Sequence, residues 1–187
     1  LDERKLSEQL ATSRTPIREA LARLEQEGLV RIVPRKGVYI VRKSKAEIME
    51  MITVWAALES MAARLVTQRA TDADISSLRT IFATFDDGEV RAHIDEYSDA
   101  NISFHMSIVD MSQCELLKSM TSNILMHIRS IRARTIGDSD RAERSIIDHM
   151  HIIEALEQRD ADLAERLTRD HALGLANHVA HNVTYLD

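Results

Sequence analysis

The chain has 187 residues, enough for one medium domain or two small ones, and it carries a formal net charge of −6. Hydrophobic residues make up 44% and aromatic residues 4%, with five glycines and two prolines, so the composition favours packed helices over a many-stranded sandwich or barrel. The single cysteine, Cys114, excludes an intramolecular disulfide framework, and no apolar run reaches the roughly 18 residues of a transmembrane helix. With no visible signal peptide either, we expect a soluble cytoplasmic protein that does not enter a membrane.

The two ends of the chain differ in charge. Residues 1–43 carry ten Lys and Arg against six Asp and Glu, a net charge of +4, whereas residues 44–187 have a net charge of −10. A basic head on an acidic body is expected when one domain meets phosphate and the other does not. We therefore place a domain boundary near residues 42–44, with a DNA-binding domain over 1–43 and a second domain over 44–187.

The head contains two short helices followed by two short strands. Residues 3–10 and 16–27 have apolar side chains at helical spacing, and a small polar turn separates them. Residues 30–33 and 38–41 are β-branched runs on either side of the basic segment 34–37, which predicts a hairpin with a basic tip. Two helices and a hairpin in this order indicate a winged helix-turn-helix.

The body shows only helical patterns. A capping box, Ser44-x-x-Glu47, opens a long amphipathic helix that ends near Gln68, and a second box, Thr71-x-x-Asp74, opens a helix that ends near Phe85. We expect four more helices, at about 88–112, 114–135, 140–158 and 160–183. The predicted fold class is mainly α: the winged helix-turn-helix, followed by an all-α antiparallel bundle of about six helices.

The second helix of the head carries the side chains best placed to read DNA. Arg14 and Arg18 are four residues apart and share one face, away from the apolar stripe that includes Ile17 and Leu21. Arginine suits forked contacts with guanine edges or phosphate. A solvated face of a small helical hairpin would carry single arginines too, but not this combination of order, spacing and charge. The further DNA-binding candidates are Arg4, Ser13, Thr15, Arg35, Lys36 and Gly37.

Three histidines and an asparagine of the body form a candidate metal site. Asn101 and His105 are four apart, so their side chains leave one helix face together, and His149 and His171 come from the last two helices. Three imidazoles and an oxygen suit a divalent transition metal, zinc first, with nickel, cobalt, copper or iron as alternatives. From spacing alone, histidines in the core or on the surface explain the pattern equally well.

The head also resembles a known family. KLSEQLATSRTPIREALARLEQEGLV followed by PRKGVYIV resembles the DNA-binding domain of the GntR family of bacterial transcription regulators. The resemblance implies a homodimer bound to two-fold-related half-sites of a double-stranded DNA operator, with Arg4, Arg14, Arg18 and the Gly37 wing tip at positions that contact DNA. Family members usually have another helix before residue 3, and we expect that helix to be truncated or disordered.

Residues 44–183 resemble the FadR C-terminal domain, or FCD domain, of one GntR subfamily. The motifs are Leu58-Glu59, Asn101-x3-His105, Asp148-His149 and Arg169-Asp170-His171. The resemblance implies one divalent metal per subunit, held by Asn101, His105, His149 and His171, which helps to coordinate a small carboxylate effector.

An acidic effector needs a cationic partner besides the metal. Arg129 and Arg132 are three residues apart on one helix and are the candidates, while His178 lies seven residues after His171 on nearly the same face. Trp55 stands where many relatives carry an arginine, which favours a less acidic or partly hydrophobic effector. Trp55, Arg129, Arg132 and His178 are therefore the predicted effector pocket.

The leading hypothesis is a DNA-binding transcription regulator, a repressor rather than an enzyme, whose operator affinity changes when a small organic acid binds at the metal site. One alternative is a metal-dependent hydrolase on a helical bundle, for which Asp148 is the only obvious general base. Another is a pure metal sensor, in which the metal itself is the signal.

Overall fold

The computed structural model describes residues 1–85, 93–136 and 141–183, without the side chains of residues 130, 133 and 134. The chain divides into two compact units, Leu1–Ser44 and Lys45–Asp187, next to the boundary predicted at residues 42–44. The predicted helix starts at residues 88 and 140 lie outside the described residues.

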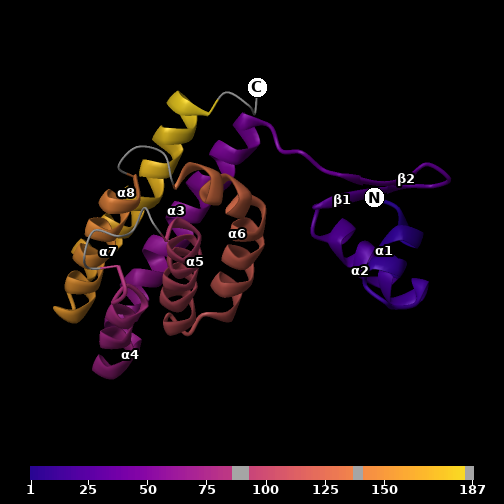
Figure 1. Cartoon of the computed structure of the whole chain (residues 1–187). Coiled ribbons are helices and arrows are strands. Elements are labelled where there is room, and N and C mark those ends of the chain that lie inside the picture. Colours follow the sequence, from indigo (N-terminus) through magenta and orange to yellow (C-terminus); the bar gives the residue numbers. More distant parts are fainter. Residues whose placement is uncertain (86–92, 137–140, 184–187) are drawn as a thin grey trace. The chain divides into compact units, whose positions relative to one another are not determined.

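The first unit consists of α1 (Glu3–Gln9), α2 (Arg14–Gln26) and the antiparallel hairpin of β1 (Val30–Val33) and β2 (Gly37–Ile40), as Figure 1 shows. The side chain of Asp2 caps α1 by accepting hydrogen bonds from the backbone N–H groups of Arg4 and Lys5. The α2 helix begins two residues earlier than predicted, because Pro16 fits anywhere in a first turn, where its missing N–H has no partner to lose. This is the predicted winged helix-turn-helix.

A small apolar core and one glycine fix the wing. Ile17 and Leu21 of α2 are buried against Val30 and Val38 of the hairpin. Val33 pairs with Gly37 across the turn, and Gly37 has a φ of +107°, a conformation that side-chain-bearing residues rarely adopt. Gly37 therefore permits the tight turn that places Arg35 and Lys36 at the tip of the hairpin.

The second unit is helical throughout its described residues, as predicted. In chain order it contains α3 (Lys45–Arg69), α4 (Asp72–Ser77), the 3₁₀-helix η1 (Leu78–Ile81), α5 (Ile94–Met111), α6 (Glu115–Thr135), α7 (Arg141–Glu157) and α8 (Ala161–Asn182). The long helix α3 packs against α5, α6 and α7 and most extensively along α8 (Figure 1). No helix among the described residues is long and apolar enough to cross a membrane.

The helix predicted over 71–85 is shorter than expected. The capping box at Thr71 and Asp74 forms as predicted, but α4 ends at Ser77 and continues as a single 3₁₀ turn. The hydroxyl groups of Ser77 and Thr80 each donate a hydrogen bond to the carbonyl group three residues earlier, at 2.6 Å in both cases. Such local bonds compete with the helix ladder.

Two apolar clusters build the core of the second unit. One surrounds Phe82, Tyr97 and Phe104, where α5, α7 and η1 meet, and the other surrounds Trp55 and Ile128, where α3, α6 and α8 meet. Polar side chains also lie fully buried in this core, and three of them are Glu59, His105 and His149. Because buried polar groups need partners, their positions mark the candidate site.

A clamp of one ion pair joins η1 to α7 and gives a pH prediction. Arg79 donates to both carboxylate oxygens of Glu157, at 2.8 and 2.7 Å, and these bonds hold the pKa of Glu157 below its ordinary value. A lowered pKa means that the contribution to stability is present above pH 4.5 and is lost as the pH falls further.

We expect Glu157→Gln to cost less than about 1 kcal/mol at pH 7, since the pair is partly exposed, and less at pH 3 than at pH 7. Urea unfolding at both pH values checks this; an equal cost at both contradicts it.

Candidate functional site

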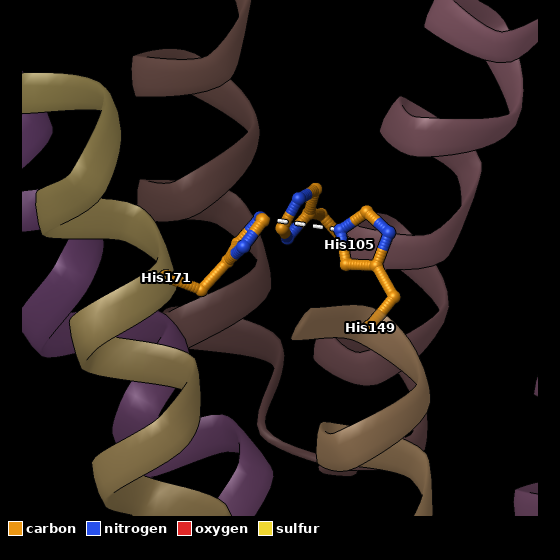
Figure 2. A group of neighbouring side chains, drawn as sticks. All are labelled: His105, His149 and His171. Carbon is orange, nitrogen blue, oxygen red and sulfur yellow. Dashed lines mark hydrogen bonds between the residues drawn. The ribbon is translucent and has the colours of Figure 1, made fainter. Parts of the chain in front are cut away.

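Three histidine rings from three helices converge in the second unit. His105 on α5, His149 on α7 and His171 on α8 each offer a ring nitrogen, and these nitrogens lie within 4.8 Å of one another. The Nε2 atoms of His149 and His171 are 3.2 Å apart, and Figure 2 shows the three rings pointing toward one another. His105 and His149 are fully buried, and the side chain of His171 is 10% exposed.

The periodicity of each helix carries its histidine inward. On α5, His105 lies on the buried face that also carries Asn101, Phe104 and Ile108. On α7, His149 lies three residues before the buried Ile152. Residues three or four apart share a helix face, so these histidines are on the core side of their helices. His151, two residues after His149, is exposed.

Each ring has a separate partner at its second nitrogen. The Nδ1 of His105 contacts a carboxylate oxygen of the buried Glu59, the Nδ1 of His171 lies 3.1 Å from a carboxylate oxygen of Asp148, and the Nδ1 of His149 lies 3.5 Å from the hydroxyl group of Tyr97. The carboxylate of Asp148 accepts the N–H of His171, so His171 carries its proton on Nδ1 and presents the Nε2 lone pair inward. An outer partner on each ring is the usual arrangement around metal-binding histidines.

Aromatic neighbours hold the central ring in place. The His149 ring stacks on Phe82, with 4.8 Å between centroids and 14° between planes, and its centroid is 4.4 Å from that of Phe104. The His105 ring meets Trp55 edge to face at 5.1 Å. The imidazoles therefore cannot rotate freely, and their convergence is fixed before any ligand binds.

The electrostatics keep the three imidazoles neutral. Burial lowers the pKa of His105, His149 and His171 below the ordinary value, and the nearby Arg132 lowers each of them further. Burial also raises the pKa of Glu59 to about 8. Neutral imidazole is the form that binds a metal, so the site favours the ligating form of its histidines.

The donor set fits a divalent transition metal. The Nε2 of His105 is buried and has no hydrogen-bond partner, which leaves an orphaned polar nitrogen at the point of convergence. Two nitrogens bound to one zinc at roughly 2.0–2.1 Å are about 3.3 Å apart in tetrahedral geometry. The 3.2 Å between the Nε2 atoms of His149 and His171 agrees with that separation.

Asn101 has two protein partners. Its side-chain oxygen accepts a hydrogen bond from Arg132, and its amide nitrogen donates to the hydroxyl group of Ser145 at 3.2 Å. Asn101 is 3% exposed, so this amide links α5 to α6 and α7 inside the core. Its role as a fourth metal ligand stays a prediction.

A cavity of about 270 Å³ opens beside the histidines. Trp55, Arg132 and His178 line it, together with Asn101 and His171. Its other lining residues are Ser98, Ile136, Arg141, Arg144, Ser145, Ile147, Asp148, Gly174 and Leu175. A volume near the lower end of the roughly 300–1,000 Å³ of ligand sites suits a small organic molecule.

The two arginines predicted for the pocket have different positions. Arg132 is 8% exposed, and its guanidinium lies over the Trp55 ring, 4.7 Å from the centroid. Arg129 lies outside the cavity lining: its side chain is 65% exposed and is 3.3 Å from Asp99. Three residues advance the helix by about 300°, so the two side chains are about 60° apart around its axis, and Arg132 lies on the core side of this arc while Arg129 lies on the exposed side.

The head presents a cationic face of its own. Arg14 and Arg18 of α2 are 68% and 73% exposed in their side chains, and one carboxylate oxygen of Glu3 lies 3.6 Å from Arg14 and 4.0 Å from Arg18. These residues border the same hollow as the wing-tip residues Arg35 and Lys36, along with Arg4 and Gly37. Ser13 is the N-cap residue of α2 but makes no capping hydrogen bond with its side chain, and Thr15 is exposed in the first turn.

Sequence reasoning missed the outer partners of the histidines. Glu59 lies on the apolar stripe of α3, four residues after Trp55 and three before Ala62, and a charged residue inside such a stripe signals a buried partner. Asp148, weighed as the base of a hydrolase, instead accepts a hydrogen bond from His171. Arg141, Arg144 and Gly174 gave no local signal, because only the packing of α7 and α8 brings them to the cavity.

The architecture defines a class of protein: a winged helix-turn-helix joined to a helical domain that contains a cavity. Residues 1–40 match the model for bacterial regulatory proteins of the gntR family, and residues 50–174 match the FCD domain. The chain therefore belongs to the gntR family and carries an FCD domain, as its sequence motifs indicated.

Relatives and solved structures agree with this assignment. The Nta operon transcriptional regulator of Aminobacter aminovorans is 36% identical over 133 residues, which cover 71% of this chain and 62% of the relative. The transcriptional repressor RspR of Escherichia coli K12 is 25% identical over 71% of this chain and 58% of its own length. The aligned part is thus less than two thirds of either relative. The structure of E. coli McbR/YncC superposes on 98% of this chain and 88% of that chain, with a TM-score of 0.85 and 20% identity, and so shares the fold.

Proposed function

We propose that this chain is a DNA-binding transcription regulator, not an enzyme, whose operator affinity is controlled by a small organic acid bound beside a divalent metal in the helical unit. The observation that carries the proposal is the convergence of three imidazoles, His105, His149 and His171, of which His171 also lines a cavity. The names of the relatives given above, which describe transcriptional regulators, support the DNA-binding half.

The head supplies the DNA contacts in this proposal. The α2 helix enters the major groove, Arg14 and Arg18 reach base edges or phosphate, and Ser13 and Thr15 approach the backbone. The basic wing tip at Arg35 contacts the neighbouring groove. Binding through these cations releases counterions, so operator affinity falls steeply with salt.

The metal has two roles in the body. Bound by His105, His149 and His171, with Asn101 as the proposed fourth ligand, it joins α5, α7 and α8 and so stabilises the folded unit. It also offers open coordination positions to a carboxylate at the cavity wall. Zinc suits this donor set first, and nickel, cobalt, copper and iron share its preference for imidazole.

The cavity supports an organic effector over a signal from the metal alone. A site that senses only a metal needs no adjoining space, yet Trp55 and Arg132 border a volume of about 270 Å³. A bound acid changes DNA affinity only if it binds the DNA-competent and DNA-free states unequally. We propose repression that the acid relieves.

A homodimer is the assembly that this function needs, because an operator with two-fold symmetry requires two heads. Apolar side chains in the body support it: Val54 and Met61 are 47% and 45% exposed on α3, and Leu116 and Met120 are 72% and 48% exposed on α6. Each pair has helical spacing, seven and four residues, and α3 packs against α6. Burying these faces in a second copy removes apolar surface from water.

Native mass spectrometry of the purified chain, combined with elemental analysis, tests the proposal. We expect a mass of two chains with one transition metal in each. In a gel-shift assay we expect the chain to retard a DNA fragment, and we expect an organic acid to change that retardation. A metal-free monomer that ignores DNA contradicts the proposal.

Asn101→Asp gives a prediction that links metal and effector. An anionic oxygen binds a cation more strongly than an amide oxygen, so metal affinity should rise. A carboxylate beside Arg132 should also neutralise that guanidinium, so affinity for an acid should fall by roughly tenfold, the value of one charge-assisted bond. Competition with a metal chelator measures the first change and titration of an acid into the metal-loaded chain the second. Equal acid affinity in both chains contradicts the proposed position of the effector.

A further inference from the structure

We propose that the cavity takes an organic acid with two anionic groups, one beside the histidines at Arg132 and the other at Arg141 and Arg144 in the first turn of α7. The inference rests on the proposed function, because it specifies the effector of that same cavity. It depends on residues of this chain from α6, α7 and α8.

The first anionic position is at Arg132. This side chain is 8% exposed, one of its terminal nitrogens donates to Asn101, and the other, NH1, is buried without a hydrogen-bond partner. The Trp55 ring covers one face of the guanidinium. A buried cationic N–H group at a cavity wall calls for an acceptor, and an anion that enters the cavity provides one.

The second position is at the start of α7. Arg141 and Arg144 both line the cavity, and they belong to the first turn of a 17-residue helix, whose N-terminal end carries a partial positive charge. Burial lowers the pKa of Arg132 to about 10; Glu59 and Tyr97 oppose this shift, and repulsion from Arg141 adds to it. Positive charge thus reaches the cavity from α6 and from α7.

The lining contains more arginines than carboxylates. Its described residues include three arginines and one carboxylate, Asp148, which already accepts a hydrogen bond from His171. The proposed metal adds further positive charge. Trp55 is neutral and stacks against the Arg132 guanidinium, so the positive charge of Arg132 remains beside the cavity. A diacid therefore fits the lining better than the less acidic effector that Trp55 alone suggested.

Gly174 provides a means of closing the cavity. It lies on α8 among the lining residues, and a Cβ atom built there has no heavy atom within 4 Å. A leucine at this position therefore extends into open space and favours the helix more than glycine does. Gly174→Leu should fold and should occupy the volume that an acid needs.

The test compares matched acids on the full chain, with and without zinc. Malate is compared with 2-hydroxybutyrate, and 2-oxoglutarate with 2-oxopentanoate, so that each pair differs by replacement of one carboxylate with a methyl group. Affinity is measured by calorimetry and by the fluorescence of Trp55, the only tryptophan. We expect each diacid to bind roughly tenfold more tightly than its partner, the value of one charge-assisted bond.

Three variants locate the effect. Arg144→Gln should abolish the preference for the diacid and should still fold, since Arg144 is exposed and not part of the core. Arg129→Gln removes the same charge outside the cavity and should keep the preference. Gly174→Leu should weaken the binding of all four acids.

The outcomes separate the two levels of the proposal. Equal affinities for diacid and monoacid, a preference that survives in Arg144→Gln, or no binding of any diacid to the wild-type chain overturns the diacid inference. Acids that bind to Gly174→Leu as they do to wild type show that the cavity is not the effector site, which overturns the effector half of the proposed function. Metal content and DNA retardation, measured on the same samples, test metal binding and DNA binding separately from effector binding.

Discussion

His149→Ala should lose its metal, whereas His151→Ala, two residues further along α7, should keep it. His149 is fully buried and presents its Nε2 3.2 Å from that of His171, while His151 is exposed. Removing an outer partner of a metal ligand costs about 10- to 100-fold in metal affinity, so loss of one of three imidazole ligands should cost more than about 100-fold. At a free metal concentration 100 times the dissociation constant, binding stabilises the wild-type chain by about 2.7 kcal/mol.

Metal content after dialysis and the melting temperature with and without metal measure these effects. The wild-type chain and His151→Ala should gain roughly 5–10 °C from metal, and His149→Ala nothing. His149→Ala leaves a cavity between Phe82 and Phe104 and could unfold the body, so His171→Ala, at the cavity wall, is the second loss variant. Metal retained by both loss variants, or lost from His151→Ala alone, would show that the ligands are on another face.

The order and type of the elements could be predicted from the sequence because each carries a local signal. Apolar spacing gave the helices, and the Pro34 to Gly37 segment between β-branched runs gave the wing. The predicted helix over 71–85 was wrong after Ser77, because the change to a 3₁₀ turn leaves no mark in an apolar pattern. Local periodicity thus predicts where a helix starts better than where it changes type.

The candidate site was predictable only where local helix periodicity determines which side chains face the core. His105 could be placed inward because the buried face of α5 repeats every three or four residues around it. Its partner Glu59 is 46 residues away on α3, and only packing brings the two together. Charge and spacing could not distinguish Arg129 from Arg132. Packing against α3 distinguishes them, because Arg132 contacts Trp55 of that helix whereas Arg129 pairs with Asp99.

Arg14→Ala and Arg18→Ala should each weaken operator binding by about 1–3 kcal/mol, or roughly 5- to 150-fold, if the side chain reads a base edge. Both side chains are about 70% exposed on one face of α2, so their removal should not disturb the core at Ile17 and Leu21. The measurement is a fluorescence titration against a duplex that the wild-type chain selects from a random pool, at several salt concentrations. A base-reading arginine loses affinity for the selected duplex alone, and a phosphate-binding one loses it for any duplex.

Glu3 supplies the opposite control for this prediction. Its carboxylate lies within 4.0 Å of both arginines and offsets part of their charge. Glu3→Gln should therefore raise affinity for unselected DNA and steepen its salt dependence, while Arg14→Ala and Arg18→Ala flatten it, since each added or removed cationic contact changes the slope by about 0.9. Lys118→Ala, a removed cation in the body, should change neither quantity. Unchanged affinity for the selected duplex in both arginine variants would remove α2 as the recognition helix, because no other exposed pair of arginines on that helix shares their face.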